Sequence, residues 1–312
     1  SGRRVIGNVV RAIIKYKLEY KMATIVSFIN FKGGVGKTTL CVEISAALAS
    51  KFNSKVLLVD LDPQTNATLS LMSESEWENH TKTKGTLKDY FAACYEQKDF
   101  DLSSIVYEYK KHSSIKKLDI LPSSIELFGM DLKVATKFGH GDIQAKILLK
   151  HSIEKLSKEY DFIFIDCPPN LYLATQNGLF ASDSYVIVAL AEYLSTIGIS
   201  HIQKSVKSIF DESREIIKKV GGNIKTPEVV GIIFNRLRYA TGGTSSEEST
   251  IKRIEGEYDG LVFNTKIPQS TKIAERPEQK IPIALSGYKA DEVYEERMEK
   301  AAEEFYERIT RP

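Results

Sequence analysis

The chain has 312 residues, of which 42% are hydrophobic, enough for one large domain or two small ones. Its three cysteines are far apart and form no C-x-x-C motif, which argues against a disulfide framework, a zinc site or a clustered iron–sulfur motif. The net charge is only +2, and no apolar run approaches the roughly 20 residues that a membrane span needs.

The first segment, residues 1–23, is a basic amphipathic extension. Its first 21 residues hold six Lys or Arg and one Glu, a charge of +5, which leaves −3 for the rest of the chain. Its apolar side chains fall on one helical face, opposite Arg4, Arg11 and Lys15. Such a helix could bind a membrane, DNA or a partner helix. It could equally pack on the protein body, or consist of a tag remnant and residues upstream of a natural start at Met22.

A strand, a glycine-rich turn and a helix come next. The apolar, β-branched run 24–31 is typical of a buried strand, and "TTLCVEISAALAS" repeats apolar residues at helical spacing. This is the context that a phosphate-binding loop requires. Its glycines let backbone N–H groups approach an anion beside the positive end of the helix. We predict nucleotide contacts from Gly33, Gly34, Val35, Gly36, Lys37, Thr38 and Thr39.

The loop departs from the pattern G-x-x-x-x-G-K-[ST] at its first position. Phe31 stands where the first glycine belongs, and Lys32 follows it. Lys37 would neutralise the β- and γ-phosphates of a nucleotide, and the Thr38 hydroxyl would ligate Mg²⁺. Lys32 is then a second cation beside the loop, and a cation supplied from another subunit would make hydrolysis depend on assembly. The alternative is a solvated loop lysine.

Two later strands end in carboxylates. "VLLVDLD" places Asp60 and Asp62 on the same face of a strand end. "FIFID" ends in Asp166, the usual place of the acidic residue that holds Mg²⁺. A lone aspartate there is more often a helix cap or a solvated turn, but three of them beside a phosphate loop indicate a catalytic site. We predict metal ligation by Thr38, Asp62 and Asp166.

The remaining runs alternate between strand-like and helical patterns. The strand-like ones include "LDILPS", "SYVIVAL", "VVGIIFNRL" and "LVFNTKIP". The alternation predicts a single α/β domain, residues 24–312, with a doubly wound, mostly parallel sheet and helices on both faces. We expect a helical insertion around 73–117 and a flexible loop over 239–250. In such sheets ligands bind at the carboxyl ends of strands, where each motif above sits.

The motifs "FKGGVGKTT", "VLLVDLDPQTNAT" and "YDFIFIDCPP", in this order and spacing, resemble the deviant Walker A ATPases of the P-loop NTPase class, specifically the ParA/Soj partition branch. The resemblance runs from about Thr24 to the C-terminus and is poor over 73–117. It implies that Lys32 reaches the phosphates of a partner subunit's ATP and that Asp62 orients the attacking water. Lys37 and Asp166 would be the other catalytic residues.

The same resemblance assigns the rest of the nucleotide site and the partners. Asn235 would recognise adenine, and Pro268 would lie against the base. The family binds ATP and Mg²⁺, forms an ATP-dependent homodimer, holds non-specific DNA, and hydrolyses ATP slowly until a ParB-like centromere-binding protein or cargo adaptor stimulates it. We therefore expect a cytoplasmic, nucleoid-associated protein that positions plasmid or chromosome. The candidate DNA contacts, for which solvated surface charge is the alternative, are Lys252, Arg253, Lys272 and Arg276.

Two departures from the family qualify this expectation. Gln269 stands where the family has an arginine, which puts a DNA or dimer contact at that position in doubt. The segment before Thr24 is too short for the helix-turn-helix extension of some ParA proteins, so we expect no operator binding.

Three alternatives stay open. A MinD-like ATPase that cycles on membranes would need a cationic C-terminal helix. This chain instead ends in "DEVYEERMEKAAEEFYERITRP", whose glutamates an anionic bilayer would repel, and only the basic extension favours a membrane. A reductase-type relative would need cluster-ligating cysteines, for which Cys94 and Cys167 lack a motif. A positioning ATPase for a cargo other than DNA is the third.

Overall fold

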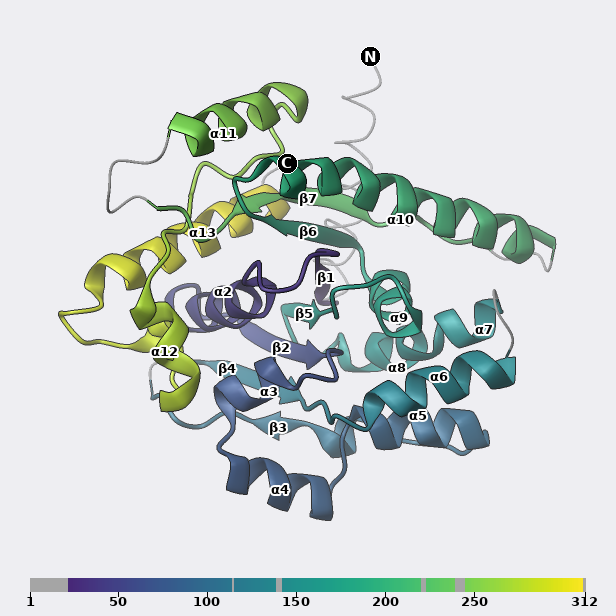
Figure 1. Ribbon diagram of the computed structural model, residues 1–312. Helices are drawn as coiled ribbons and strands as arrows, with labels where there is room; N and C mark the ends of the chain where they lie inside the picture. Colours follow the sequence, from purple (N-terminus) through teal and green to yellow (C-terminus); the bar gives the residue numbers. More distant parts are fainter. Residues whose placement is uncertain (1–21, 114, 139–141, 220–222, 239–244, 311–312) are drawn as a thin grey trace.

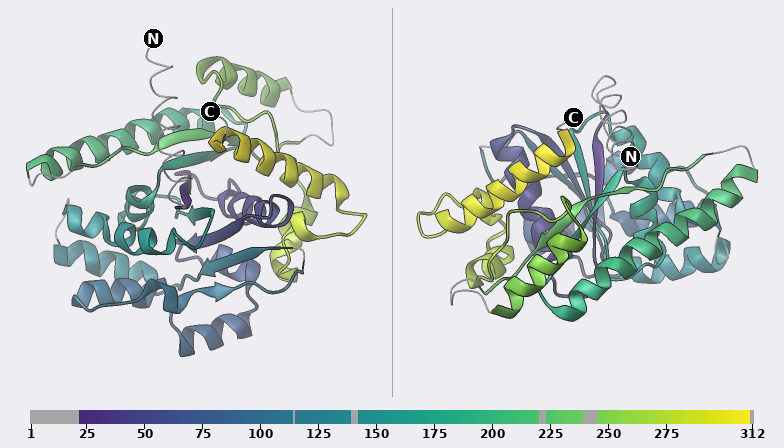
Figure 2. Two further views of the ribbon diagram at one scale, coloured as in Figure 1. Left: turned by 180° about the vertical axis from the view of Figure 1, so that it is seen from behind. Right: turned by 90° about the horizontal axis from the view of Figure 1, so that it is seen from above.

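The computed structural model describes residues 22–113, 115–138, 142–219, 223–238 and 245–310 (Figure 1). The predicted α/β architecture is confirmed, because the strands of this part of the chain form one sheet in the order β3-β4-β2-β5-β1-β6-β7. Neighbouring strands run parallel except β3, which is antiparallel to β4. Helices cover both faces (Figures 1 and 2). Residues 1–21, the basic extension, lie outside the described residues.

The central strands are apolar runs that the sheet buries on both faces. Every residue of β1, β5 and β6 is buried, as expected for parallel strands covered by helices. Because β5 lies between β1 and β2, the carboxyl ends of these three strands are neighbours. The strands are β1 (Thr24–Ile29), β2 (Lys55–Asp60), β3 (Tyr107–Glu108), β4 (Lys117–Leu121), β5 (Phe162–Asp166), β6 (Ser184–Ala189) and β7 (Glu228–Phe234).

The helices divide into two layers, each packed on its own apolar core. One layer centres on α2, which packs along α13 (Figure 2). This layer contains α2 (Lys37–Lys51), α3 (Asn66–Leu71), α12 (Thr271–Gln279), η3 (Ile283–Leu285) and α13 (Glu292–Thr310). The other contains α5 (Leu87–Glu96), η1 (Leu102–Ile105), α6 (Leu127–Phe138), α7 (Ile143–Lys146), α8 (Leu148–Leu156), α9 (Leu173–Ala181), α10 (Tyr193–Lys219) and α11 (Ser245–Glu257).

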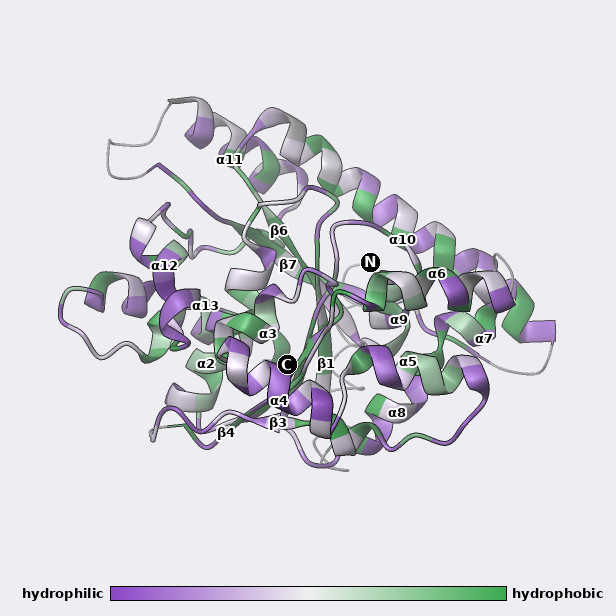
Figure 3. Ribbon diagram, turned by 60° about the horizontal axis from the view of Figure 1, so that its bottom comes forward, coloured by the Kyte–Doolittle hydropathy of each residue, from purple (hydrophilic) through white to green (hydrophobic). Residues whose placement is uncertain are grey.

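The region 73–117 holds α5, η1 and the largely hydrophilic helix α4 (Glu74–Thr83; Figure 3). It also contributes β3 to the sheet, which we did not expect. The strand has only two residues, so no alternation of apolar and polar side chains could reveal it.

Segment 261–268, which we predicted as a strand, does not form a regular strand in the structure. It meets β7 at an isolated bridge between Ile232 and Val262 and at a hydrogen bond from the Ile267 N–H to the Phe234 carbonyl, and Pro268 forms a second isolated bridge with Leu237, just after β7. Between them the carboxylate of Glu304 on α13 accepts the backbone N–H groups of Asn264 and Thr265, at 2.8 and 2.9 Å. Because those two donors are taken by a side chain, the ladder of a regular strand cannot continue.

The polar stretch 239–250 corrects a second expectation. From Ser245 onward it is not a loop but the first part of α11. Glu247 and Glu248 lie in the first turn of that helix, where negative charge is favourable beside the positive end of the helix dipole. Residues 239–244 lie outside the described part of the chain.

Candidate nucleotide-binding site

The phosphate loop connects the carboxyl end of β1 to the start of α2. Gly34 and Gly36 adopt φ values of 74° and 84°, in the left-handed region that glycine tolerates best. A Cβ on Gly36 would also lie only 2.0 Å from the Asn235 Nδ2 atom. Gly36 is therefore required both by its backbone conformation and by the close packing of Asn235. The loop presents the N-terminal end of α2, a favourable place for phosphate.

Lys37 and Thr38 both contact Asp166 at the end of β5. The Lys37 Nζ atom lies 2.9 Å from Asp166 Oδ1, and the Thr38 hydroxyl donates to Oδ2 at 2.6 Å. Burial acts to lower the pKa of Lys37, but the ion pair and hydrogen bond with Asp166 outweigh it and raise the pKa. The lysine is thus a charged donor that β- and γ-phosphates could attract away from Asp166.

Hydroxyl and carboxylate oxygens here suit Mg²⁺, which is usually held by one or two such groups together with phosphates. Among the described residues, no three His, Cys, Asp or Glu side chains gather to hold a metal ion. The Thr38 hydroxyl and the Asp166 carboxylate lie together and have the ligand chemistry that suits such an ion. Metal ligation by Thr38, Asp62 and Asp166 stays a prediction.

Asp62 follows β2 and is 5% exposed. Its Oδ1 atom accepts the Gln64 N–H at 3.0 Å, and burial raises the pKa of its carboxyl. Asp60 is fully buried and paired in register with Asp166, and burial together with the charge of Asp166 raises the pKa of its carboxyl. Orientation of the attacking water by Asp62 stays a prediction.

Lys32 lies at the surface edge of the loop. Its backbone N–H donates to Asn30 Oδ1 at 2.7 Å, and its Nζ atom pairs with Glu192 Oε2 at 2.7 Å. The Lys32 and Glu192 side chains are 47% and 52% exposed. The ammonium group is thus held by a weak surface ion pair, while Lys37 takes Asp166.

The predicted adenine side lies where β7 ends. Asn235 is 5% exposed and donates from Nδ2 to the Val35 carbonyl of the phosphate loop at 2.8 Å. Pro268 forms an isolated parallel bridge with Leu237, two residues after Asn235. The structure brings Asn235 to the loop and places Pro268 beside Leu237, and adenine recognition by both Asn235 and Pro268 stays a prediction.

Two residues at the site escaped sequence reasoning. Arg236 donates to the Gly34 carbonyl at 2.7 Å and holds a left-handed φ of 56°, a strained conformation for arginine. Asn30 is buried, and its side chain joins the Lys32 N–H to the Val188 carbonyl. Both residues fix the backbone of the loop. In the sequence, the only indication of a role was that Arg236 follows Asn235 and that Asn30 lies two residues before Lys32.

The candidate DNA contacts differ in accessibility. Lys252 is exposed on α11. Arg253, 41% exposed, pairs with Glu257 and donates to Thr196 on α10 at 2.6 Å. The Lys272 side chain on α12 is 40% exposed and lies 3.1 Å from an Asp291 oxygen. DNA binding by these three stays a prediction.

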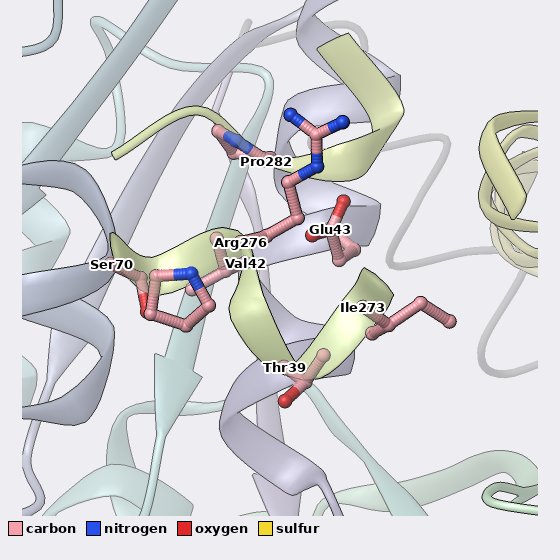
Figure 4. A pocket seen from close by; sticks show the side chains of 8 residues that line it. Thr39, Val42, Glu43, Ser70, Ile273, Arg276 and Pro282 are labelled. Atoms are coloured by element: carbon pink, nitrogen blue, oxygen red, sulfur yellow. The ribbon is translucent and has the colours of Figure 1, made fainter. Parts of the chain in front are cut away.

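Arg276 is corrected. The residue is 4% exposed, and its guanidinium is engaged by Asp291, Ser286 and Gln279, so it is a structural group rather than a phosphate contact. Figure 4 shows its side chain beside Glu43 in a small pocket that Thr39, Ser70 and Pro282 also line.

Glu43 is a buried acid on α2. It is 3% exposed, and its carboxylate accepts the N–H groups of Ile283 and Ala284, both at 2.9 Å. These bonds join the helix behind the phosphate loop to η3 and oppose the rise in pKa. Burial still raises the Glu43 pKa to about 7.

Glu43 should make stability fall as pH rises from about 4.5 to 7. The folded state binds its proton more tightly than the unfolded chain, so this stabilisation is complete below the unfolded pKa and is lost by about pH 7. The difference is about 3 kcal/mol. Between pH 5 and pH 8, urea unfolding should show a larger fall in the free energy of unfolding for wild type than for Glu43→Gln. Glu275→Gln, on the exposed side of α12, should show the same fall as wild type. A Glu43→Gln protein with the wild-type pH dependence would contradict it.

Comparison with known proteins extends over most of the chain. A family model described as an AAA domain matches residues 23–219. The sporulation initiation inhibitor protein Soj of Bacillus subtilis is 31% identical, over 85% of this chain and 91% of that protein. The chromosome-partitioning ATPase Soj of Treponema pallidum is 30% identical, over 90% of this chain and 96% of its own length.

Solved structures are similar in fold. The ATP complex of an McdA variant from Cyanothece superposes with a TM-score of 0.69 at 22% identity, covering 92% of this chain and 96% of that one. A putative plasmid partition protein from Borrelia burgdorferi bound to AMPPNP gives 0.64 at 22% identity, covering 91% and 99%. Among the helices of the described residues, none combines the length with the apolar composition of a membrane span.

Proposed function

This chain belongs to the ParA/Soj family of partition ATPases, and from that premise we propose that it is a DNA-partition switch. It is a positioning ATPase with a P-loop nucleotide site. In the proposed cycle, ATP joins two copies in a sandwich, and the dimer binds DNA without regard to sequence. Slow, Mg²⁺-dependent hydrolysis, stimulated by a ParB-like partner on the cargo, then releases it.

The position of Lys32 supports the dimer. Lys37 already occupies the phosphate loop and pairs with Asp166 in the interior. Lys32 instead carries its ammonium at the surface, where a half-exposed ion pair with Glu192 could be exchanged at little cost for a stronger contact. A triphosphate on a second copy offers that contact, because it concentrates negative charge.

The proposed hydrolysis uses residues of this site. ATP and Mg²⁺ would supply the γ-phosphoryl group and much of the charge neutralisation. Lys37 would turn from Asp166 to the phosphates, and Thr38 and Asp166 would hold the metal ion. Asp62 would hold the attacking water in line. Lys32 of the second copy would offset charge that develops on the transferred group.

DNA binding would draw on exposed cations outside the nucleotide site. Lys252, Arg253 and Lys272 come from α11 and α12, and the segment before α12 is bridged at Pro268 to Leu237, two residues after Asn235, which contacts the phosphate loop. Phosphate contacts of this kind require only positioned positive charge and weaken steeply with salt. A nucleotide that orders this region could therefore change its affinity for DNA.

Retention on DNA should depend on the nucleotide. We expect the protein to be retained on non-specific duplex DNA with a non-hydrolysable ATP analogue, to be released with ADP, and to lose retention as salt rises. The double variant Lys252→Ala, Lys272→Ala should be retained less. Lys300→Ala, which removes a half-exposed lysine from α13, should behave as wild type.

Anionic liposomes run in parallel separate the alternatives. Equal DNA binding in ADP and ATP would sink the switch model. Retention on liposomes but not on DNA would favour a membrane-cycling ATPase. ATP-induced dimers that bind neither would point to a cargo other than DNA.

A further inference from the structure

We propose that a closed ring of buried hydrogen bonds aims Asp62, and that Thr68 and Ser123 are positioning residues for ATP hydrolysis. The inference rests on the proposed role of Asp62 in orienting the attacking water. Neither hydroxyl belongs to the phosphate loop. Thr68 lies on α3, and Ser123 lies in the loop that follows β4.

The ring joins four residues from three segments of chain. The Asp60 Oδ1 atom accepts the Asp62 N–H at 3.2 Å, and its Oδ2 atom accepts the Thr68 N–H at 2.8 Å and the Thr68 hydroxyl at 2.7 Å. The Thr68 Oγ1 atom in turn accepts the Ser123 N–H at 2.9 Å. The Ser123 hydroxyl donates to the Asp62 carbonyl at 2.8 Å, which closes the ring.

This arrangement holds the Asp62 residue at both of its backbone polar groups. Its N–H is fixed by Asp60 and its carbonyl by Ser123, while the Gln64 N–H holds one carboxylate oxygen. With all three fixed, the free carboxylate oxygen has one direction in which to point. Such pre-set geometry matters because a 1 Å misplacement of a catalytic group can cost about 10²-fold in rate.

Burial makes the ring cooperative. Asp60, Thr68 and Ser123 have no exposed surface, so water cannot replace a lost partner. The Thr68 hydroxyl makes two hydrogen bonds of the ring, since it donates to Asp60 and accepts from the Ser123 N–H. Removing it leaves a buried N–H and a buried carboxylate oxygen short of partners, and both must shift to recover them. Movement of Asp60 would displace the Asp62 N–H, and movement of Ser123 would displace the Asp62 carbonyl.

The test compares three threonine variants. Thr68→Val keeps the shape but removes the hydroxyl, and should lower kcat for ATP at least tenfold while the nucleotide Kd changes less than about threefold. Thr68→Ser restores the hydroxyl and should recover most of kcat. Thr83→Val is the matched control, because the Thr83 hydroxyl serves only the Asn79 carbonyl on exposed α4, and its kcat should equal that of wild type.

Two readouts separate failure of this inference from failure of the proposed function. Absence of ATP hydrolysis by wild type would reject the proposed function. Amide hydrogen exchange tests the ring independently, because opening it should speed exchange of the Asp62 N–H at least tenfold in Thr68→Val but not in Thr68→Ser. Equal exchange in wild type and Thr68→Val, or a lower kcat matched by an equal loss in Thr68→Ser, would overturn the positioning role.

Discussion

Replacing Lys32 with alanine should abolish ATP-induced dimerisation while leaving ATP binding to the single chain largely intact. The lysine takes no part in the pairing of Lys37 with Asp166, so the protomer's own loop keeps its charge. A cation supplied from a neighbouring subunit is typically worth about 10³–10⁵ in phosphoryl-transfer rate, so hydrolysis should fall by at least about 10³-fold. Light scattering with an ATP analogue measures the first effect, and phosphate release the second.

Two controls isolate contact with the partner's nucleotide from the ion pair within one chain. Glu192→Gln breaks the ion pair with Lys32 but keeps the lysine, and should still dimerise. Lys55→Ala removes an exposed lysine from the opposite end of the sheet, at the start of β2, and should be indistinguishable from wild type. Dimers of Lys32→Ala at wild-type concentration would show that the role in trans is wrong.

Replacing Asp62 with alanine should separate ATP binding from ATP hydrolysis. Removal of a group that orients or deprotonates the attacking water commonly costs about 10²–10⁴ in rate. The variant should still bind ATP, dimerise and stay on DNA, and it should leave DNA far more slowly than wild type in the presence of ATP. Single-turnover hydrolysis and the dissociation rate from DNA measure the two effects.

Asp62→Asn sharpens this comparison because it preserves volume and one acceptor oxygen for the Gln64 N–H. It should be nearly as slow as Asp62→Ala if the carboxylate charge carries the reaction. An Asp62→Ala protein that hydrolyses ATP within about tenfold of wild type would remove Asp62 from the mechanism.

The fold and the position of the phosphate loop were predictable from sequence because they depend on local patterns. A buried strand, glycines with left-handed φ and a helix beginning at Lys37 all lie within one short stretch. The apolar run that ends in Asp166 predicts a strand end in the same way, and the parallel sheet brings that strand beside β1. What these residues bind stays a prediction.

The remaining features depend on contacts between distant segments. The sequence around Arg276 predicts a surface cation, because it does not show that Asp291 and Ser286, 15 and 10 residues later, pack against the guanidinium. Segment 261–268 has the composition of a strand, but Glu304, some 40 residues later, takes its N–H groups. Nothing in a local pattern shows that a distant side chain will compete with a strand partner.

The two margins of the sheet bear on how many copies could assemble on DNA. One margin is the two-residue strand β3, where Glu108 pairs with Lys110. At the other, the backbone of Ile232 and the Phe234 carbonyl are already bonded to 261–268. Short, charged or covered margins resist the addition of another strand. Filaments built by extending the sheet from chain to chain are therefore disfavoured, so copies of this chain that assemble further would have to do so through surfaces other than the sheet margins.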